Sequence, residues 1–100
     1  MLLCPINPVT AIPHDHSFNV LERTITINGA PRPYNDQMVW AGLVGMAFLP
    51  ATVAPVGRSS DGLPVGIQIV GPYLEDRTPI DVAKRLADVI GGFEAPPGFD

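Results

Sequence analysis

The sequence predicts an α/β fold, with a small mixed β-sheet, a central antiparallel hairpin and helices packed on it. The hairpin is predicted by two apolar runs, 51–56 and 65–70, because the short turn-rich segment between them suits antiparallel neighbours. The helices are predicted by two stretches, 36–48 and 78–90, whose apolar residues follow the helical period. Because the chain has 100 residues, we expect a single domain over residues 1–100.

The N-terminal third reads as strand, loop and hairpin. Residues 2–4 form a short apolar run that is predicted to be a buried strand ending at Pro5. Residues 5–18 carry three prolines and no periodicity, which is typical of a long ordered loop lining a cleft. Residues 24–27 alternate with period two and run into Asn28-Gly29, a strong hairpin signal. The prolines that follow restrict the returning arm to a short edge strand.

The helix predicted over 36–48 is apolar nearly all round, and we expect Asn35 or Asp36 to cap it. No charge occurs from Met38 to Gly57, a stretch about as long as a membrane-spanning helix. Prolines in its second half would break such a helix, so we expect no membrane span. A helix with this composition is normally buried on both sides.

The helix predicted over 78–90 has the clearest boundaries. We expect Thr78 to cap it, Pro79 to take its first position and Gly91-Gly92 to end it. Ile80, Ala83, Ala87 and Ile90 are predicted to form one packing side. The remaining residues, 93–100, are expected to be extended and able to dock.

Composition excludes several classes of protein. The chain is 46% hydrophobic and 16% charged, with a net charge of −4. Such a chain is too apolar for a disordered tail. Its excess of acidic residues argues against binding to nucleic acid or to anionic membrane surfaces. The single cysteine, Cys4, excludes an internal disulfide and is expected to be buried and reduced, in keeping with a cytoplasmic chain. A small domain has a large surface, and so few charged residues cover it poorly. We therefore expect either that a partner covers part of the surface or that the chain is a piece of a larger protein.

His14-Asp15-His16 is the one cluster of candidate ligands. A catalytic zinc site usually needs a third, distant ligand, and none is evident, so we predict no metal. We expect these residues to be polar groups at a cleft rim. Contact with a substrate in a larger assembly, or a metal site, are the alternatives.

Groups able to perform nucleophilic chemistry are few. Ser59 and Ser60 lie in the predicted hairpin turn, and Lys84 lies on the polar face of the last helix beside Asp81 and Asp88. A catalytic lysine must lose its proton, which requires burial or a cationic neighbour. We therefore predict no nucleophile–base pair, and the absence of a phosphate-cradling glycine motif predicts no cofactor.

Two motifs carry a resemblance to a known family. They are LPATVAPVG at 49–57 and GLPVGIQIVGP at 62–72, followed by Glu75-Asp76 and by the glycines and prolines of 91–98. Together they resemble the C-terminal end of amidase signature family enzymes. The resemblance covers essentially the whole chain and is most specific over residues 49–76.

The resemblance implies the fold and chemistry of that family. Its members hydrolyse amide C–N bonds with a Ser–cis-Ser–Lys triad in a glycine- and serine-rich N-terminal region, which nothing in this chain matches. No catalytic residue is therefore carried over. The resemblance also implies that this end supplies sheet strands, covering helices and part of the substrate-pocket wall. By position the candidate wall residues are Trp40, Phe48, His14, Asp15 and His16.

Three hypotheses on function follow from the resemblance and the composition. The first is a C-terminal amidase fragment, inactive as a hydrolase by itself and associating through its apolar surface as a homodimer. The second is a polypeptide that complements a separately encoded N-terminal amidase portion, with a small-molecule amide as the substrate of the pair. The third is a non-catalytic module that binds a small molecule or dimerises.

Overall fold

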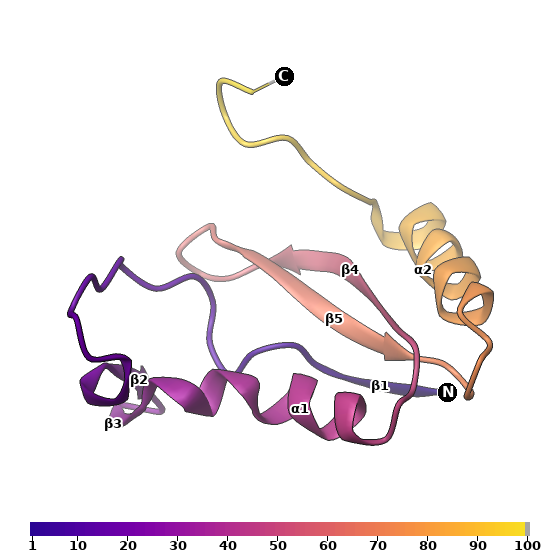
Figure 1. Ribbon diagram of the computed structural model, residues 1–100. Helices are drawn as coiled ribbons and strands as arrows, with labels where there is room; N and C mark the ends of the chain where they lie inside the picture. The colour runs from indigo at the N-terminus through magenta and orange to yellow at the C-terminus, as the bar shows by residue number, and fades with distance from the viewer. Residues whose placement is uncertain (100) are drawn as a thin grey trace.

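The computed structural model describes residues 1–99 and confirms the predicted α/β class (Figure 1). A three-stranded sheet in the order β1-β5-β4 lies between two helices, and a two-stranded sheet, β2-β3, lies beside it. Every described strand pairing is antiparallel, so the sheet of this chain is antiparallel where we expected a mixed one. The elements are β1 (Leu2–Pro5), η1 (Val20–Glu22), β2 (Thr24–Ile27), β3 (Ala30–Pro33), η2 (Tyr34–Met38), α1 (Val39–Met46), β4 (Ala51–Arg58), β5 (Pro64–Val70) and α2 (Arg77–Ile90).

The predicted hairpin 51–56/65–70 is confirmed as β4 and β5, with Ala54 opposite Ile67. The Gly71 N–H donates to the Pro50 carbonyl at 2.8 Å, which fixes the alternation of hydrogen bonds along the ladder. Pro55 then falls at a position whose nitrogen faces away from β5, so its missing N–H removes no ladder bond. The register shifts between Pro55 and Gly57, where the strand bulges.

Helix α1 covers one face of the sheet over β1 and β5. Val44 of the helix packs with Cys4 and Val70 in a buried cluster, and Trp40 and Leu49 lie partly buried against it. The N-terminal run 2–4 is thus confirmed as a strand, and its cysteine is buried as expected. The prediction that the whole strand is buried was wrong, since Leu2 and Leu3 are 51% and 57% exposed at the edge of the sheet.

Helix α2 packs against β4 and β5. Because side chains alternate along a strand, Ile69 and Ala54 point to the face opposite Val70, and both are buried there. The two helices therefore lie on opposite faces of the sheet. They leave open the parts that neither covers, where Leu3 and Val53 are each 57% exposed.

The predicted start of the first helix was wrong by three residues. The α-helix begins only at Val39, after a 3-10 turn, and neither Asn35 nor Asp36 caps it. The Asp36 carboxylate accepts instead from Arg32 Nε at 2.8 Å, so it is not available to the backbone. The helix ends at Met46, and Phe48 lies beyond it with a φ of 53°. Only Val44 is buried, so the helix is far from buried on both sides.

The second helix begins at Arg77, one residue before the predicted cap. The Thr78 hydroxyl donates to the Glu75 carboxylate at 3.0 Å, and Pro79 is buried in the first turn against Gly71. Gly91 follows the helix with a φ of 90°, which confirms the predicted end. Ile80 and Ile90, expected on the packing side, are 56% and 49% exposed because one small sheet cannot cover the whole apolar stripe.

The hairpin signal at Asn28-Gly29 is confirmed, since both residues have positive φ between β2 and β3. The loop over 5–18 is confirmed as well, and it leads into the short turn η1, which the sequence pattern did not predict. After α2 the chain runs away from the sheet (Figure 1), and Arg58 Nη2 holds it through Glu94 at 2.7 Å. Phe93 is exposed in this extended segment, and Asp100 lies outside the described residues.

The surface of the chain is large for its mass. It exposes 7573 Å², whereas a compact monomer of 10.6 kDa exposes roughly 5,500 Å² by the scaling of surface with mass. The radius of gyration is 15.4 Å, against about 13 Å for a compact chain of this length. Within residues 1–99, no helix is long and apolar enough to cross a membrane. The composition indicated too few charged residues to cover the surface of a small domain. The structure gives the reason, because many apolar side chains have no partner within this chain to pack against.

Candidate functional site: an apolar hollow without catalytic groups

The site begins with a hollow of about 440 Å³ between the β2-β3 hairpin and the start of α1. The hairpin turn brings Asn28 to one side, and the first turn of α1 brings Trp40 to the other. The lining is mostly apolar and consists of Pro8, Ile27, Asn28, Ala30, Arg32, Asp36, Val39 and Trp40. The hollow is open to solvent, so on its own it offers an apolar surface and does not enclose a ligand.

The polar edge of this hollow is an ion pair. Arg32 Nε donates to Asp36 Oδ2 at 2.8 Å, with the two side chains 59% and 25% exposed. The pair satisfies the carboxylate, and a half-exposed pair of this kind contributes about 0–1 kcal/mol to stability. It gives the hollow a fixed polar edge but supplies neither a free base nor a nucleophile.

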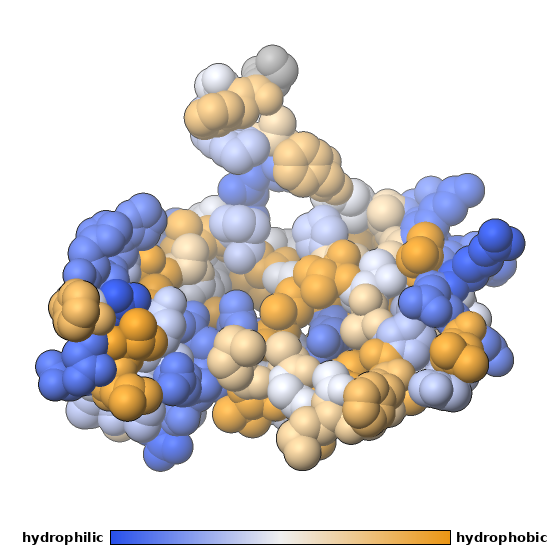
Figure 2. Space-filling view, in the orientation of Figure 1, coloured by the Kyte–Doolittle hydropathy of each residue, from blue (hydrophilic) through white to orange (hydrophobic). Residues whose placement is uncertain are grey.

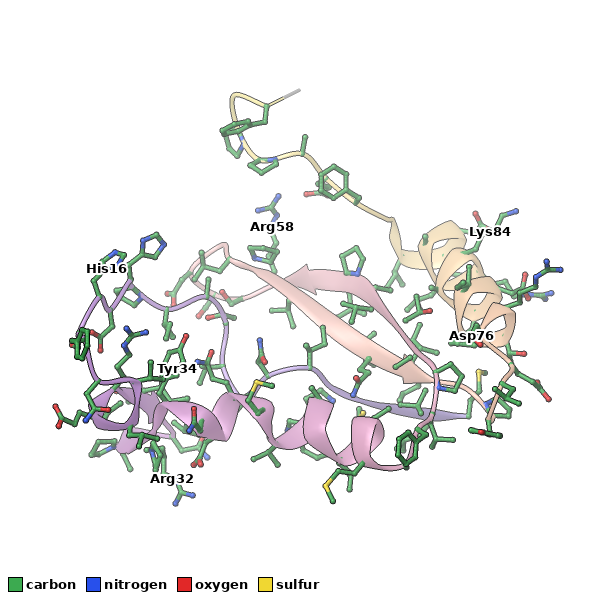
Figure 3. The ribbon with its side chains drawn as sticks, viewed as in Figure 1. His16, Arg32, Tyr34, Arg58, Asp76 and Lys84 are labelled. Atoms are coloured by element: carbon green, nitrogen blue, oxygen red, sulfur yellow. The ribbon has the colours of Figure 1, made fainter. Side chains whose placement is uncertain are left out.

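Residues 13–18 of the loop, which include His14, Asp15 and His16, are all exposed. The Ser17 hydroxyl and backbone N–H both donate to the Asp15 carboxylate, and these hydrogen bonds lower the pKa of Asp15 below its ordinary value. The two imidazole rings stack edge to face with centroids 5.7 Å apart, and Figure 3 shows His16 pointing away from α1. These residues form a local turn rather than a ligand set, and residues 1–99 hold no cluster of three or more metal-binding side chains.

Of the five predicted wall residues, Trp40 is the one that lines the hollow. Phe48 is 81% exposed beyond α1, and the three residues of the exposed loop lie outside the lining. The structure does not bring these five side chains together. Their role in the wall of a larger pocket stays a prediction.

Apart from the exposed turn that holds Asp15 and Ser17, the side chains able to act as nucleophile or base are dispersed over the described part of the chain. Ser59 Oγ accepts from the Leu63 N–H at 3.2 Å within the β4-β5 turn. Lys84 lies on the outer side of α2, where Figure 3 shows it pointing away from the sheet. Cys4 Sγ is buried and accepts from Gln68 Nε2 at 3.3 Å.

Three lining residues are ones that the sequence pattern does not indicate as part of a site. The pattern places Asn28 in a turn, Asp36 at a helix cap and Arg32 in an edge strand. The four-residue spacing of Arg32 and Asp36 could have indicated their ion pair, but this spacing brings two side chains together only where the backbone is helical. Here the pair spans the junction of β3 and η2, so sequence spacing alone could not indicate it.

Comparison with known proteins supports one family. The family model described as Amidase matches residues 1–79. Fatty-acid amide hydrolase 2-A of Danio rerio is 32% identical over 96 residues, which are 96% of this chain and 15% of that protein. Human Fatty-acid amide hydrolase 2 is 35% identical over 68% of this chain and 12% of its own length.

A second group of relatives carries a different name. A glutamyl-tRNA(Gln) amidotransferase subunit from Xanthobacter autotrophicus is 38% identical over 55% of this chain and 11% of its own length. The chain thus spans between about a tenth and a sixth of the relatives named here. The family match over most of the chain, and a relative similar over nearly all of it, show that the chain belongs to the amidase signature family.

Proposed function

We propose that this chain is the C-terminal portion of an amidohydrolase and that it is not catalytic alone. In that role it supplies sheet strands, helices and pocket wall to an enzyme whose catalytic groups lie in an upstream portion. The single observation that carries the proposal is the combination of family membership with a chain whose hydroxyl–carboxylate contacts, Ser17 to Asp15 and Thr78 to Glu75, lie in exposed turns and not in a pocket.

The proposal assigns residues 1–100 to one structural unit within that enzyme. We assign contact with an apolar portion of a substrate to the hollow at Trp40, with the Arg32–Asp36 pair at its edge. Phe48 and the loop of His14, Asp15 and His16 would join the wall only where the upstream portion packs against them. A fatty-acid amide is the first substrate to test, since the relatives similar over most of this chain carry that name. A cytoplasmic location is proposed on the buried, reduced state expected of Cys4.

The test uses three protein samples and one assay, the release of ammonia from a primary fatty-acid amide. The samples are this chain alone, the Danio rerio relative without the segment that this chain matches, and the two mixed. We expect no release from either part alone and release from the mixture. Hydrolysis by this chain alone would overturn the proposal, and so would full activity of the shortened relative without it.

A mixture that forms a complex but releases no ammonia would contradict the complementation form of the proposal. Association is therefore measured on the same mixture by size-exclusion chromatography. A chimera in which this chain replaces the matched segment covalently is the second arm, because covalent linkage removes the need for association from solution. An inactive but folded chimera would count against a shared catalytic architecture.

A further inference from the structure

The turn between β2 and β3 exposes an asparagine that is followed by a glycine, Asn28-Gly29. Both residues have positive φ, 52° and 77°, as a two-residue hairpin turn requires. A Cβ added at Gly29 would meet nothing within 4 Å, so the space beside this residue is open. The hairpin lies at the left end of the molecule, where Figure 2 shows blue, hydrophilic residues at the surface. Water therefore reaches both the Asn28 carboxamide and the Gly29 backbone.

We propose that Asn28 is a site of spontaneous deamidation, with water as the co-reactant. In the first step the Gly29 backbone nitrogen loses its proton and forms a bond to Asn28 Cγ. The Cγ–Nδ2 bond breaks, and Nδ2 leaves as ammonia with that proton. Water then opens the resulting cyclic imide: opening at Cγ gives aspartate, and opening at the backbone carbonyl carbon gives isoaspartate. In sum, water replaces ammonia and a neutral amide becomes an ionised carboxylate.

Two of the other asparagines lack the conditions for this reaction. Asn7 precedes Pro8, whose nitrogen carries no proton to lose. The Asn19 carboxamide is fixed at both ends, because Nδ2 donates to Glu22 Oε1 at 2.8 Å and Oδ1 accepts from the Leu21 N–H at 3.1 Å. The attack on Cγ would have to break these hydrogen bonds first.

The fourth asparagine, Asn35, is exposed like Asn28 but is followed by Asp36. The side chain of Asp36 begins directly beside the nitrogen that would have to attack, whereas Gly29 has no side chain and permits close approach of its backbone. Within residues 1–99, no hydrogen bond of the kind that fixes Asn19 holds the carboxamide of Asn28. Asn28 is thus the asparagine that should react first.

The β2-β3 hairpin allows the movement that ring closure needs. The intact turn holds Asn28 and Gly29 at fixed dihedral angles, so the ring closes while the turn is locally open. The hairpin is a two-stranded sheet with four residues in each strand, and all of β3 is exposed. Hairpins of two strands are marginally stable, and segments with little buried surface open at low free energy. The reactive geometry is therefore reached while the β1-β5-β4 sheet stays folded.

Deamidation would change the edge of the hollow beside α1. Asn28 lines this hollow together with Arg32 and Asp36. The reaction adds one negative charge to a chain whose net charge is −4. Isoaspartate in addition carries the backbone through Cγ, which lengthens the turn by one methylene group and alters the two-residue loop. The inference goes beyond the proposed function and does not depend on it.

The test is peptide mapping by mass spectrometry of the folded full chain during incubation at neutral and mildly alkaline pH. All four asparagines are followed in the same sample. We expect the acid to form at Asn28 at least about tenfold faster than at Asn19 or Asn35, as a mixture of aspartate and isoaspartate. The rate should rise with pH, because the Gly29 nitrogen must lose its proton. Absence of product at Asn28, or equal rates at Asn28, Asn19 and Asn35, would overturn the proposal.

Asn28→Asp is the matched control, because it carries the new charge from the start and aspartate tolerates positive φ. On isoelectric focusing, the incubated wild type should form a more acidic species at the position of the fresh variant. The variant itself should form a further acidic species at least about tenfold more slowly than wild type. An acidic shift of the variant at the wild-type rate would place the reaction elsewhere and refute the assignment. Circular dichroism confirms that both proteins are folded during the incubation.

Discussion

Gly71, directly after β5, lies in close contact with the first turn of α2, and it gives the sharpest prediction on stability. A Cβ added at Gly71 would lie 2.6 Å from Pro79 Cδ and 3.0 Å from Pro79 Cγ. Both atoms belong to a rigid ring that is fully buried in the first turn of α2, so the ring cannot swing aside. Gly71→Ala therefore requires α2 to shift away from the sheet.

The magnitude follows from two opposing terms. Overpacking of this kind costs about 1–3 kcal/mol, while replacing glycine with alanine recovers about 0.4–1 kcal/mol by restricting the unfolded chain. The net expectation is a loss of about 1–2 kcal/mol in the free energy of unfolding. For a chain of this size each kcal/mol corresponds to roughly 4–8 °C in Tm.

The same chemical change at two other glycines provides the controls. Gly45→Ala meets nothing within 4 Å and lies in a helix, so it should stabilise the chain by about 0.5–1 kcal/mol. Gly66→Ala would meet Ile6 Cδ1 at 2.7 Å, the movable end of a side chain, and the Ala54 carbonyl oxygen at 3.3 Å, so its effect should fall between the other two. The assay is thermal unfolding by circular dichroism at one fixed protein concentration. A Gly71→Ala protein as stable as wild type or Gly45→Ala would refute this account of the packing.

Two further predictions concern the core and the exposed loop. Ile69→Ala should lower the free energy of unfolding in urea by about 2–5 kcal/mol because Ile69 is fully buried, whereas Leu21→Ala, at 78% exposed, should change it by less than about 0.5 kcal/mol; equal effects would contradict the assigned core. The Asp15 carboxyl should titrate by NMR below its ordinary pKa, and Ser17→Ala should move that pKa back up. Because the folded pKa is lowered, the stabilisation is present above the ordinary carboxyl pKa and is lost as pH falls through the folded value; an Asp15 pKa unchanged by Ser17→Ala would refute the role of these hydrogen bonds.

The elements that local sequence determines were predicted well. Asn28-Gly29 imposes a turn through its own backbone preference, and the pair of apolar runs around the 57–64 turn determines the β4-β5 hairpin. Helix ends were predicted less well, because a side chain that could cap a helix can instead bind another side chain. Asp36 has the right chemistry for a cap, but Arg32 binds its carboxylate.

Which residues are buried and which line the hollow depends on how the elements pack together. The periodicity of the sequence carries no information on that packing. Ile80 and Ile90 belong to the apolar stripe of α2, yet a three-stranded sheet is too narrow to cover them. The hollow forms where the β2-β3 hairpin meets the start of α1, and only Trp40 among the predicted wall residues reaches it. The remaining predicted wall residues, Phe48 and the three residues of the exposed turn, lie outside the lining of the hollow.

The central claim is that this chain supplies structure and no catalytic group to an amidohydrolase. A triple variant, Ser59→Ala with Ser60→Ala and Lys84→Ala, tests it most directly in the chimera or in the mixture with the shortened relative. We predict that ammonia release from a fatty-acid amide matches that of the unsubstituted chain within about twofold, a difference of less than about 0.5 kcal/mol in activation free energy. Loss of activity in a triple variant that still folds and associates would contradict the claim.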